Sequence, residues 1–296
     1  MASLKEVRIR IESIHSTQQI TSAMKLVAAS KLRRTQNAVQ ALAPYAAKLR
    51  EILGNLTSSL ENTDEAVYST VRPVQRVLLL VITSNRGLCG PFNSNAIKAA
   101  KAYIDEHYRE INRKGQLDLY PIGKKGTDFF RKNKFNVVNA NNDIFDALTF
   151  VNTVAIAEEL MAAFATKKYD KIEIIYNHFR NSGQQVLTIE QYLPIIPVAV
   201  VQGAKTGKWL ANYIFEPEKS VLVRELIPKM LKVQLYKTIL DSYAAEHGAR
   251  MTAMAQATEN AQDLLKQLRL SYNKARQSAI TKELLEIVSG AEALRG

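Results

Sequence analysis

A phosphate-binding loop is the first chemistry that the glycine spacing of this sequence suggests. Residues 203–208, with the sequence GAKTGK, imitate a P-loop, but their glycines are one residue too close together. Trp209 also stands where a serine or threonine must hold magnesium. The loop at residues 87–90 lacks the glycines of a dinucleotide-binding turn, and residues 123–127 are typical of a solvated turn. We therefore predict no phosphate-cradling loop.

Residues that could perform acid–base, nucleophilic or metal chemistry are scattered along the chain. The four histidines show no pair at metal-ligand spacing: His15, His107, His178 and His247. Cys89 has no base partner that the sequence identifies, and Glu158-Glu159 is predicted to lie on the solvated face of a helix. Because Cys89 is the only cysteine, no intrachain disulfide can form, which fits a reducing compartment. We predict no catalytic residue, no metal site and no cofactor.

The elements that organise the chain are its two ends. No proline or glycine precedes Ala43, and the stretch from Lys229 to Ser289 contains only Gly248. Both stretches carry apolar residues at the three-and-four spacing of one helical stripe. The N-terminal stripe comprises Leu4, Val7, Ile11, Ile14, Ile20, Met24, Val27 and Leu32. The C-terminal stripe comprises Leu231, Leu235, Ile239, Leu264, Leu268, Tyr272, Ile280, Leu284 and Ile287.

Helices of this length need a partner of similar length. A sixty-residue helix would span roughly 90 Å, which is far more than the diameter of a compact domain. Each end is the only suitable partner for the other, so we predict an antiparallel two-helix coiled coil formed by the N- and C-terminal segments. Pro44 either kinks the first helix or opens a second one in line with it.

Polar residues interrupt both stripes. They are Gln18, Gln19 and Thr21 in the first, and Thr252, Gln256, Thr258 and Asn260 in the last. Such residues weaken a seam relative to leucine. They indicate either a stutter or polar layer within the coil, or helix faces that meet a third protein.

The middle of the chain alternates between strand-like and helix-like segments. Strands are expected at 76–83, 117–122, 135–138, 171–177 and 185–193, and helices at 93–114, 127–132 and 146–166. This alternation predicts a Rossmann-like α/β domain with a largely parallel sheet. The expected organisation is an N-terminal coil helix at 1–56, the α/β domain at 74–200, a loop at 201–218 and a C-terminal coil helix at 219–296.

The formal charge of +12 is concentrated in the two ends. Residues 1–56 hold nine Lys/Arg against three Asp/Glu, and residues 219–296 hold twelve against eight. A basic rod indicates an acidic partner surface. Neither end carries the aromatic platforms or base-reading motifs expected of a nucleic-acid binder. A basic coiled-coil scaffold or nucleic-acid-binding protein with an α/β head is the alternative hypothesis. No run of about 18 apolar residues occurs, so a soluble or peripheral protein is expected.

Three stretches resemble one known family. Residues 16–31 (STQQITSAMKLVAASK) are similar to the opening helix of the gamma subunit of F-type ATP synthases. Residues 84–90 (SNRGLCG) resemble that family's loop after its first strand, and residues 272–291 (YNKARQSAITKELLEIVSGA) resemble its C-terminal signature. The three motifs occur in the family's order and span almost the whole chain.

The resemblance implies a rotor shaft with no catalytic residues of its own. It implies that the terminal coil turns inside a ring of three alpha and three beta subunits, driven by proton or sodium flow through a membrane-embedded c-ring. The epsilon subunit and the c-ring are the partners implied at the foot, and the delta subunit is a further candidate. Nucleic acid is not an implied partner, and the membrane is reached only through the c-ring. The implied location is peripheral, on the cytoplasmic face of the bacterial inner membrane.

The resemblance also implies roles for individual residues. Contacts to the alpha/beta ring are implied for Met24, Lys25, Arg86, Cys89, Arg250, Arg276 and Gln277. Tyr213 and Glu216 would touch the c-ring or the epsilon subunit, although Phe215 stands where the family often has tyrosine. The single cysteine leaves no dithiol switch of the kind found in plant plastid members.

Overall fold

The computed structural model describes residues 4–57, 67–195 and 219–293. Contacts between Cα atoms divide the chain into two compact units. The smaller unit comprises Met1–Ala29 and Arg250–Gly296, and the larger comprises Ser30–Ala249. Two long helices, α1 (Leu4–Thr57) and α6 (Lys219–Ala293), contribute to both units. The divisions therefore fall inside the helices, and the predicted loop at 201–218 lies outside the described residues.

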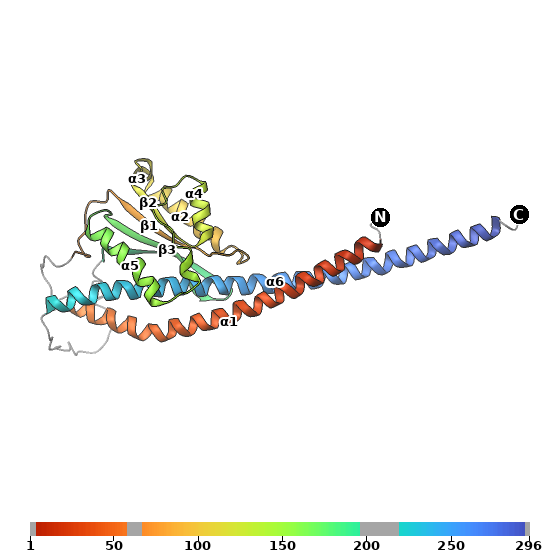
Figure 1. Cartoon of the computed structure of the whole chain (residues 1–296), viewed down its shortest axis with the longest axis horizontal. Coiled ribbons are helices and arrows are strands. Elements are labelled where there is room, and N and C mark those ends of the chain that lie inside the picture. Colours follow the sequence, from red (N-terminus) through yellow and green to blue (C-terminus); the bar gives the residue numbers. More distant parts are fainter. Residues whose placement is uncertain (1–3, 58–66, 196–218, 294–296) are drawn as a thin grey trace. The chain divides into compact units, whose positions relative to one another are not determined.

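The two terminal helices pair in antiparallel fashion within each unit (Figure 1). In the smaller unit the Oγ1 atoms of Thr21 and Thr258 are 2.8 Å apart. In the larger unit Leu49 packs in one hydrophobic cluster with Ile227 and Leu231. The predicted antiparallel coiled coil is confirmed. Pro44 lies inside α1 without ending it, so the first segment is one helix.

The seam of α1 differs from the predicted stripe after Ile14. Thr21, Ala28 and Leu32 are buried, whereas the predicted seam residues Ile20 and Val27 are 58% and 59% exposed. Assigning Ile20 and Val27 to the seam was therefore wrong. A coiled-coil seam repeats every 3.5 residues, and counting from Leu4 at alternating steps of three and four reaches the half-buried Gln18 and the buried Thr21 and Ala28. It also reaches Lys25, which is exposed. Thr21 with Thr258 forms a polar layer, one of the two interpretations of the interruptions.

The last turns of α6 extend beyond α1. Leu4 precedes Thr21 by seventeen residues and so falls opposite residue 275, seventeen residues after Thr258. Ile280, Leu284 and Ile287 lie past that point and are exposed. Their predicted place in the seam was wrong, because the described part of α1 supplies no surface opposite them.

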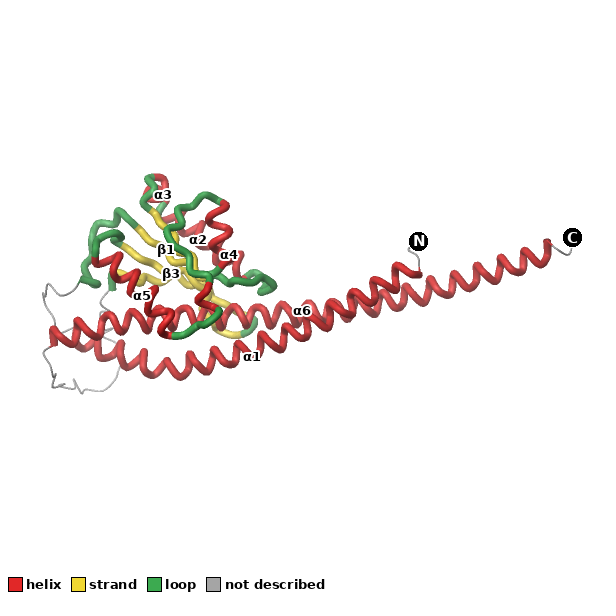
Figure 2. The backbone as a smooth tube through the Cα atoms, in the orientation of Figure 1, coloured by secondary structure: helices red, strands yellow, loops and turns green. Residues whose placement is uncertain are grey.

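The α/β part of the larger unit is built on a four-stranded sheet (Figure 2). Its strands are β1 (Val77–Ile82), β2 (Leu117–Ile122), β3 (Lys171–Asn181) and β4 (Gln184–Leu193), in the spatial order β2-β1-β3-β4. β1 is parallel to both neighbours, and β4 is antiparallel to β3. The largely parallel sheet is therefore confirmed.

Helices cover both faces of this sheet (Figure 1). One face packs against α2 (Phe92–His107) and α4 (Lys124–Lys132) through residues such as Ile104 and Phe130. The other packs against α5 (Phe150–Ala165) and α6 through residues such as Leu160 and Leu235. Every residue of β1 is buried, which explains its continuous apolar sequence.

Several predicted elements have different bounds: the helix expected at 127–132 begins at Lys124, and the strand expected at 171–177 continues to Asn181. The helix expected at 93–114 is divided into α2 and α3 (Arg109–Arg113) at Tyr108, whose hydroxyl donates a hydrogen bond to the buried carboxylate of Glu173. The strand expected at 135–138 is reduced to a single bridge between Val137 and Leu119. The helix expected at 146–166 begins four residues later, as α5 at Phe150, and the 3₁₀ turn Asp143–Phe145 precedes it. No described helix is long and apolar enough to cross a membrane.

Candidate interaction surfaces

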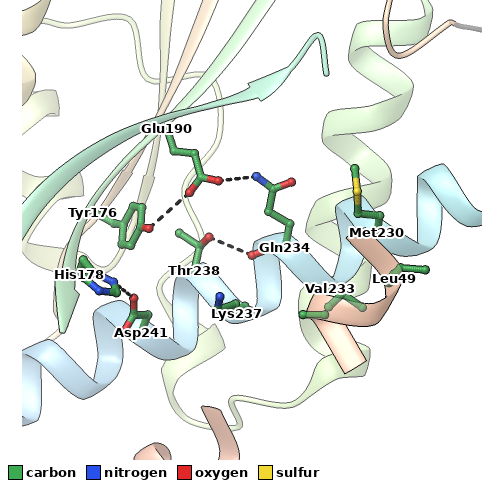
Figure 3. Close-up of a pocket in the computed structure, with 11 residues that line it drawn as sticks. Leu49, Tyr176, His178, Glu190, Met230, Val233, Gln234, Lys237, Thr238 and Asp241 are labelled. Atoms are coloured by element: carbon green, nitrogen blue, oxygen red, sulfur yellow. Dashed lines mark hydrogen bonds and ion pairs between the residues drawn. The ribbon is translucent and has the colours of Figure 1, made fainter. Parts of the chain in front are cut away.

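A small cavity lies between β3, β4 and α6 in the larger unit (Figure 3). Its volume is about 90 Å³, and its polar lining includes Tyr176, His178, Glu190, Gln234, Lys237, Thr238 and Asp241. Sites for small molecules usually enclose about 300–1,000 Å³. The cavity has room for a few waters and not for a nucleotide.

The charged groups of this cavity bind one another. Asp241 accepts from His178 Nδ1 and from the backbone N–H of Phe179 at 3.3 Å. Burial raises the pKa of Asp241 above its ordinary value, while the neighbouring His178 acts in the opposite direction. Glu190 accepts from Gln234 at 2.7 Å. These side chains therefore join the β3–β4 hairpin to α6.

The geometry around the other candidate groups supports packing rather than catalysis. Cys89 is 1% exposed, its Sγ accepts from Asn93 Nδ2 at 3.2 Å, and it packs in a cluster with Phe92 and Ala249. Glu158 pairs with Lys232 at 2.6 Å, and Glu159 accepts from Tyr120 at 3.2 Å. Within the described ranges, no group of three His, Cys, Asp or Glu residues could hold a metal.

The turn at 123–127 has no amide donors to spare for a phosphate. The backbone N–H groups of Lys124, Lys125 and Gly126 donate to Asn85 Oδ1, Ser84 O and Thr83 Oγ1 at 2.9–3.1 Å. An anion site at a helix N-terminus needs such donors to be available. The GAKTGK segment at 203–208 lies outside the described residues.

The smaller unit brings together most of the residues that the family resemblance singled out. Met24 is half-buried and Lys25 is exposed on α1, and the pairing of Thr21 with Thr258 places Arg250 close to opposite Ala29. Arg250 is buried. Arg276 and Gln277 are exposed on α6, next to residue 275, which lies opposite the first residue of α1, Leu4.

Some apolar residues of this unit form an exposed surface that the sequence analysis did not predict. Ile9, Ile20 and Val27 are exposed on α1. They are separated by eleven and seven residues, which correspond to about three and two helical turns, so they form one row. We call this row the outer row of α1. The spacing was visible in the sequence, but apolar character alone had assigned two of its members to the seam.

The other implied ring contact lies in the larger unit, in the loop between β1 and α2. Arg86 is exposed there and Cys89 is buried. Leu88, which lies between them and belongs to the same implied contact, is 63% exposed and has a φ of 62°. Ser84 Oγ donates to the backbone oxygen of Arg86 at 2.6 Å, which fixes the loop. Tyr213 and Glu216, the implied foot residues, lie outside the described residues.

Comparisons with known proteins agree along the whole chain. The family model described as ATP synthase matches residues 3–294. A protein of Flavobacterium johnsoniae named ATP synthase gamma chain is 53% identical over 296 residues, covering 100% of both chains. The gamma chain of Cytophaga hutchinsonii is 50% identical over 294 residues, covering 99% of each chain.

Solved structures share the fold. A chain of the mitochondrial ATP synthase of Euglena gracilis, described as OSCP/F1/c-ring, has a TM-score of 0.68 at 21% identity, covering 98% of this chain and 94% of that one. A chain of the Tetrahymena thermophila enzyme, described as central stalk/c-ring, has a TM-score of 0.58 at 24% identity, covering 80% and 99%. With full-length relatives above half identity and motifs at both ends and the middle, the chain belongs to the ATP synthase gamma chain family.

Proposed function

We propose that this chain is the central rotor shaft of an F-type ATP synthase, a non-catalytic subunit that transmits torque between an ion-driven c-ring and a catalytic alpha/beta hexamer. The names of the relatives and the descriptions of the solved structures support this function.

The observation that carries the proposal is the outer row of α1. Ile9, Ile20 and Val27 are exposed although the coil seam is already filled by other residues. On α6, Leu284 and Ile287 are also exposed, past the residue that lies opposite the start of α1 at Leu4. A coil that stood alone in water would gain solubility from charge at these positions. Apolar outer faces fit a shaft that is enclosed by other proteins.

The proposed contacts follow the family resemblance. Met24 and Lys25 would lie near an acidic loop of the beta subunits, as would Arg250, whose side chain is buried in this chain. Arg276 and Gln277 would form hydrogen bonds with a beta-subunit loop near the tip. Arg86 would make a further ring contact, and buried Cys89 would hold its loop in place. Charge-assisted contacts of this kind contribute about 1.5–3 kcal/mol each.

The remaining parts of the proposal concern the foot and the cell. Tyr213 and Glu216 would touch the c-ring or the epsilon subunit, with the delta subunit as another partner of the assembly. The coupling ion is a proton or a sodium ion. The complex would lie on the cytoplasmic face of the bacterial inner membrane, which this chain reaches only through the c-ring.

Affinity purification tests the function. The tagged chain, expressed in its native host and purified at moderate salt, should elute with two nucleotide-binding subunits, each present at three copies per copy of this chain. Elution as a lone species that shifts DNA in a gel would contradict the proposal and support the basic-scaffold alternative.

A further inference from the structure

The β3–β4 hairpin is joined to α6 by a series of directional hydrogen bonds. Tyr192 OH donates to the backbone oxygen of Leu231 at 3.1 Å, and Gln234 Nε2 donates to Glu190 Oε1 at 2.7 Å. Figure 3 shows Glu190 reaching from β4 to Gln234 of the helix. Both contacts lie on the side of α6 that faces the hairpin, about one helical turn apart.

Two turns farther along α6, Asp241 continues the series. One carboxylate oxygen pairs with His178 Nδ1 and the other accepts from the backbone N–H of Phe179 at 3.3 Å. Asp241 is buried, whereas the side chain of His178 is half exposed. A carboxylate held by a ring nitrogen and a backbone amide at once is fixed in both position and orientation.

The hairpin also packs closely against α6 at Gly248. A Cβ atom at this position would lie 2.9 Å from Phe179 Cε2 and 3.4 Å from Ser182 Cα. The Phe179 ring also packs with Ala245, Ala249 and Cys89. The hairpin therefore lies so close to α6 here that a side chain at 248 would force the Phe179 ring to shift.

These contacts differ in kind from the apolar packing of α1 on α6 in the larger unit. In the same unit, Leu49 meets Ile227 and Leu231 through apolar surface. Apolar burial is not directional, so such surfaces can slide with little loss until contact area is lost. Hydrogen bonds weaken steeply as their angles change, so a series of them resists twisting about the helix axis.

We propose that the β3–β4 hairpin is a clamp that passes torque between the α/β part and helix α6, with His178, Asp241 and Phe179 as its positioning residues. The inference rests on the proposed shaft function and names the contacts through which the load enters the helix. Tyr192 and Glu190 hold the end of the clamp nearer the start of α6, at Leu231 and Gln234, and Asp241 holds the other end.

The torsional stiffness of the assembled shaft tests the clamp. The alpha/beta/gamma complex is fixed by its ring, and a bead is attached through Lys101→Cys, an exposed position on α2. The buried Cys89 leaves that thiol as the reactive one in the described part of the chain. The angular variance of the bead at a dwell then measures how firmly the α/β part grips α6.

We expect Asp241→Asn and His178→Gln each to raise the angular variance about twofold, because each removes the charge-assisted contact. Glu158→Gln is the matched control: it breaks the Lys232–Glu158 pair between α5 and α6, which lies outside the hairpin, and should leave the variance unchanged. Because His178 is half exposed, its substitution is compatible with folding even if Asp241→Asn is not.

The outcomes separate the clamp from the shaft. Rotation of the bead with unchanged variance in both variants, or an equal rise in Glu158→Gln, would overturn the clamp alone. A bead that never rotates in the unsubstituted complex would overturn the proposed function and the clamp together.

Discussion

Thr21 and Thr258 meet across the coiled coil, with their Oγ1 atoms 2.8 Å apart. Each hydroxyl also lies within hydrogen-bond distance of a carbonyl of its own helix, at 3.0 Å from Gln18 O and 2.8 Å from Met254 O. The polar layer is therefore satisfied without water. Its neighbours on the seam, Ala28 and Ala261, are small, so the helices are held together here by modest contacts.

Replacing both threonines should leave the coil as stable or more stable. Removing both partners of a buried hydrogen bond and keeping the shape is close to neutral, so we expect Thr21→Val with Thr258→Val to change the free energy of unfolding by about 1 kcal/mol or less. Thr281→Val is the control, because Thr281 makes the same bond to its own helix at an exposed position. A loss above about 2 kcal/mol in urea unfolding would show that the pair stabilises the coil more than geometry implies.

Gly123 should tolerate no side chain. Its φ is 102°, and a Cβ atom would lie 2.3 Å from the backbone oxygen of Thr83. We expect Gly123→Ala to lower the free energy of unfolding by about 3 kcal/mol or more. Gly115→Ala is the comparison, because the φ of Gly115 is 69° but no atom lies within 4 Å of an added Cβ. Only the strain of a left-handed backbone should then lower its free energy of unfolding, by about 1–2 kcal/mol. Equal losses in the two variants would contradict the close approach to Thr83.

The α/β part should lose stability in alkali. Burial raises the pKa of Tyr120 and Tyr192 above the ordinary value of 10.0. Above pH 10 the unfolded chain therefore releases protons that the folded chain keeps. The stability is complete below pH 10 and falls as pH rises toward the folded pKa, by about 1.4 kcal/mol per pH unit for each such tyrosine. Tyr120→Phe should reduce this slope in denaturant titrations at pH 10–12. An unchanged slope would count against burial as the cause.

Met24→Lys should impair coupling more than ATP hydrolysis. The substitution adds a cation beside Lys25, where the proposal places an acidic loop of the surrounding ring. A new interfacial ion pair can add about 1.5 kcal/mol or more, which would hold one dwell too long. Ions pumped per ATP in membrane vesicles should fall, while Ala102→Lys, at an exposed position on α2, should not change the ratio. An unaltered ratio in Met24→Lys would argue against this placement.

Local signals in the sequence predicted much of the fold. The continuous apolar run of β1 was predicted because burial on both faces removes polar residues from a strand. The bounds of β2 at 117–122 were also predicted. The seam after Ile14 was misassigned because side-chain type was given more weight than the 3.5-residue spacing. At the break at Tyr108 the side chain bonds Glu173, sixty-five residues away, a contact that no local sequence pattern indicates.

The contacts of the candidate clamp were equally invisible in the sequence. His178 and Asp241 are sixty-three residues apart and belong to a strand and a helix whose pairing only the fold determines. By contrast, the residues expected to contact the ring were inferred from resemblance to family motifs. Whether each is exposed depends on the side of the coil on which it lies. Cys89 illustrates the limit, because its motif is intact while its thiol is buried.

Direct observation of rotation tests whether this chain turns as a shaft inside the alpha/beta ring. With the alpha/beta ring fixed to a surface and a bead on Lys101→Cys, we expect unidirectional rotation with threefold periodicity when ATP is added. ATP hydrolysis by the same complexes while the bead stays stationary would contradict the shaft function, because the chain would then not turn during catalysis.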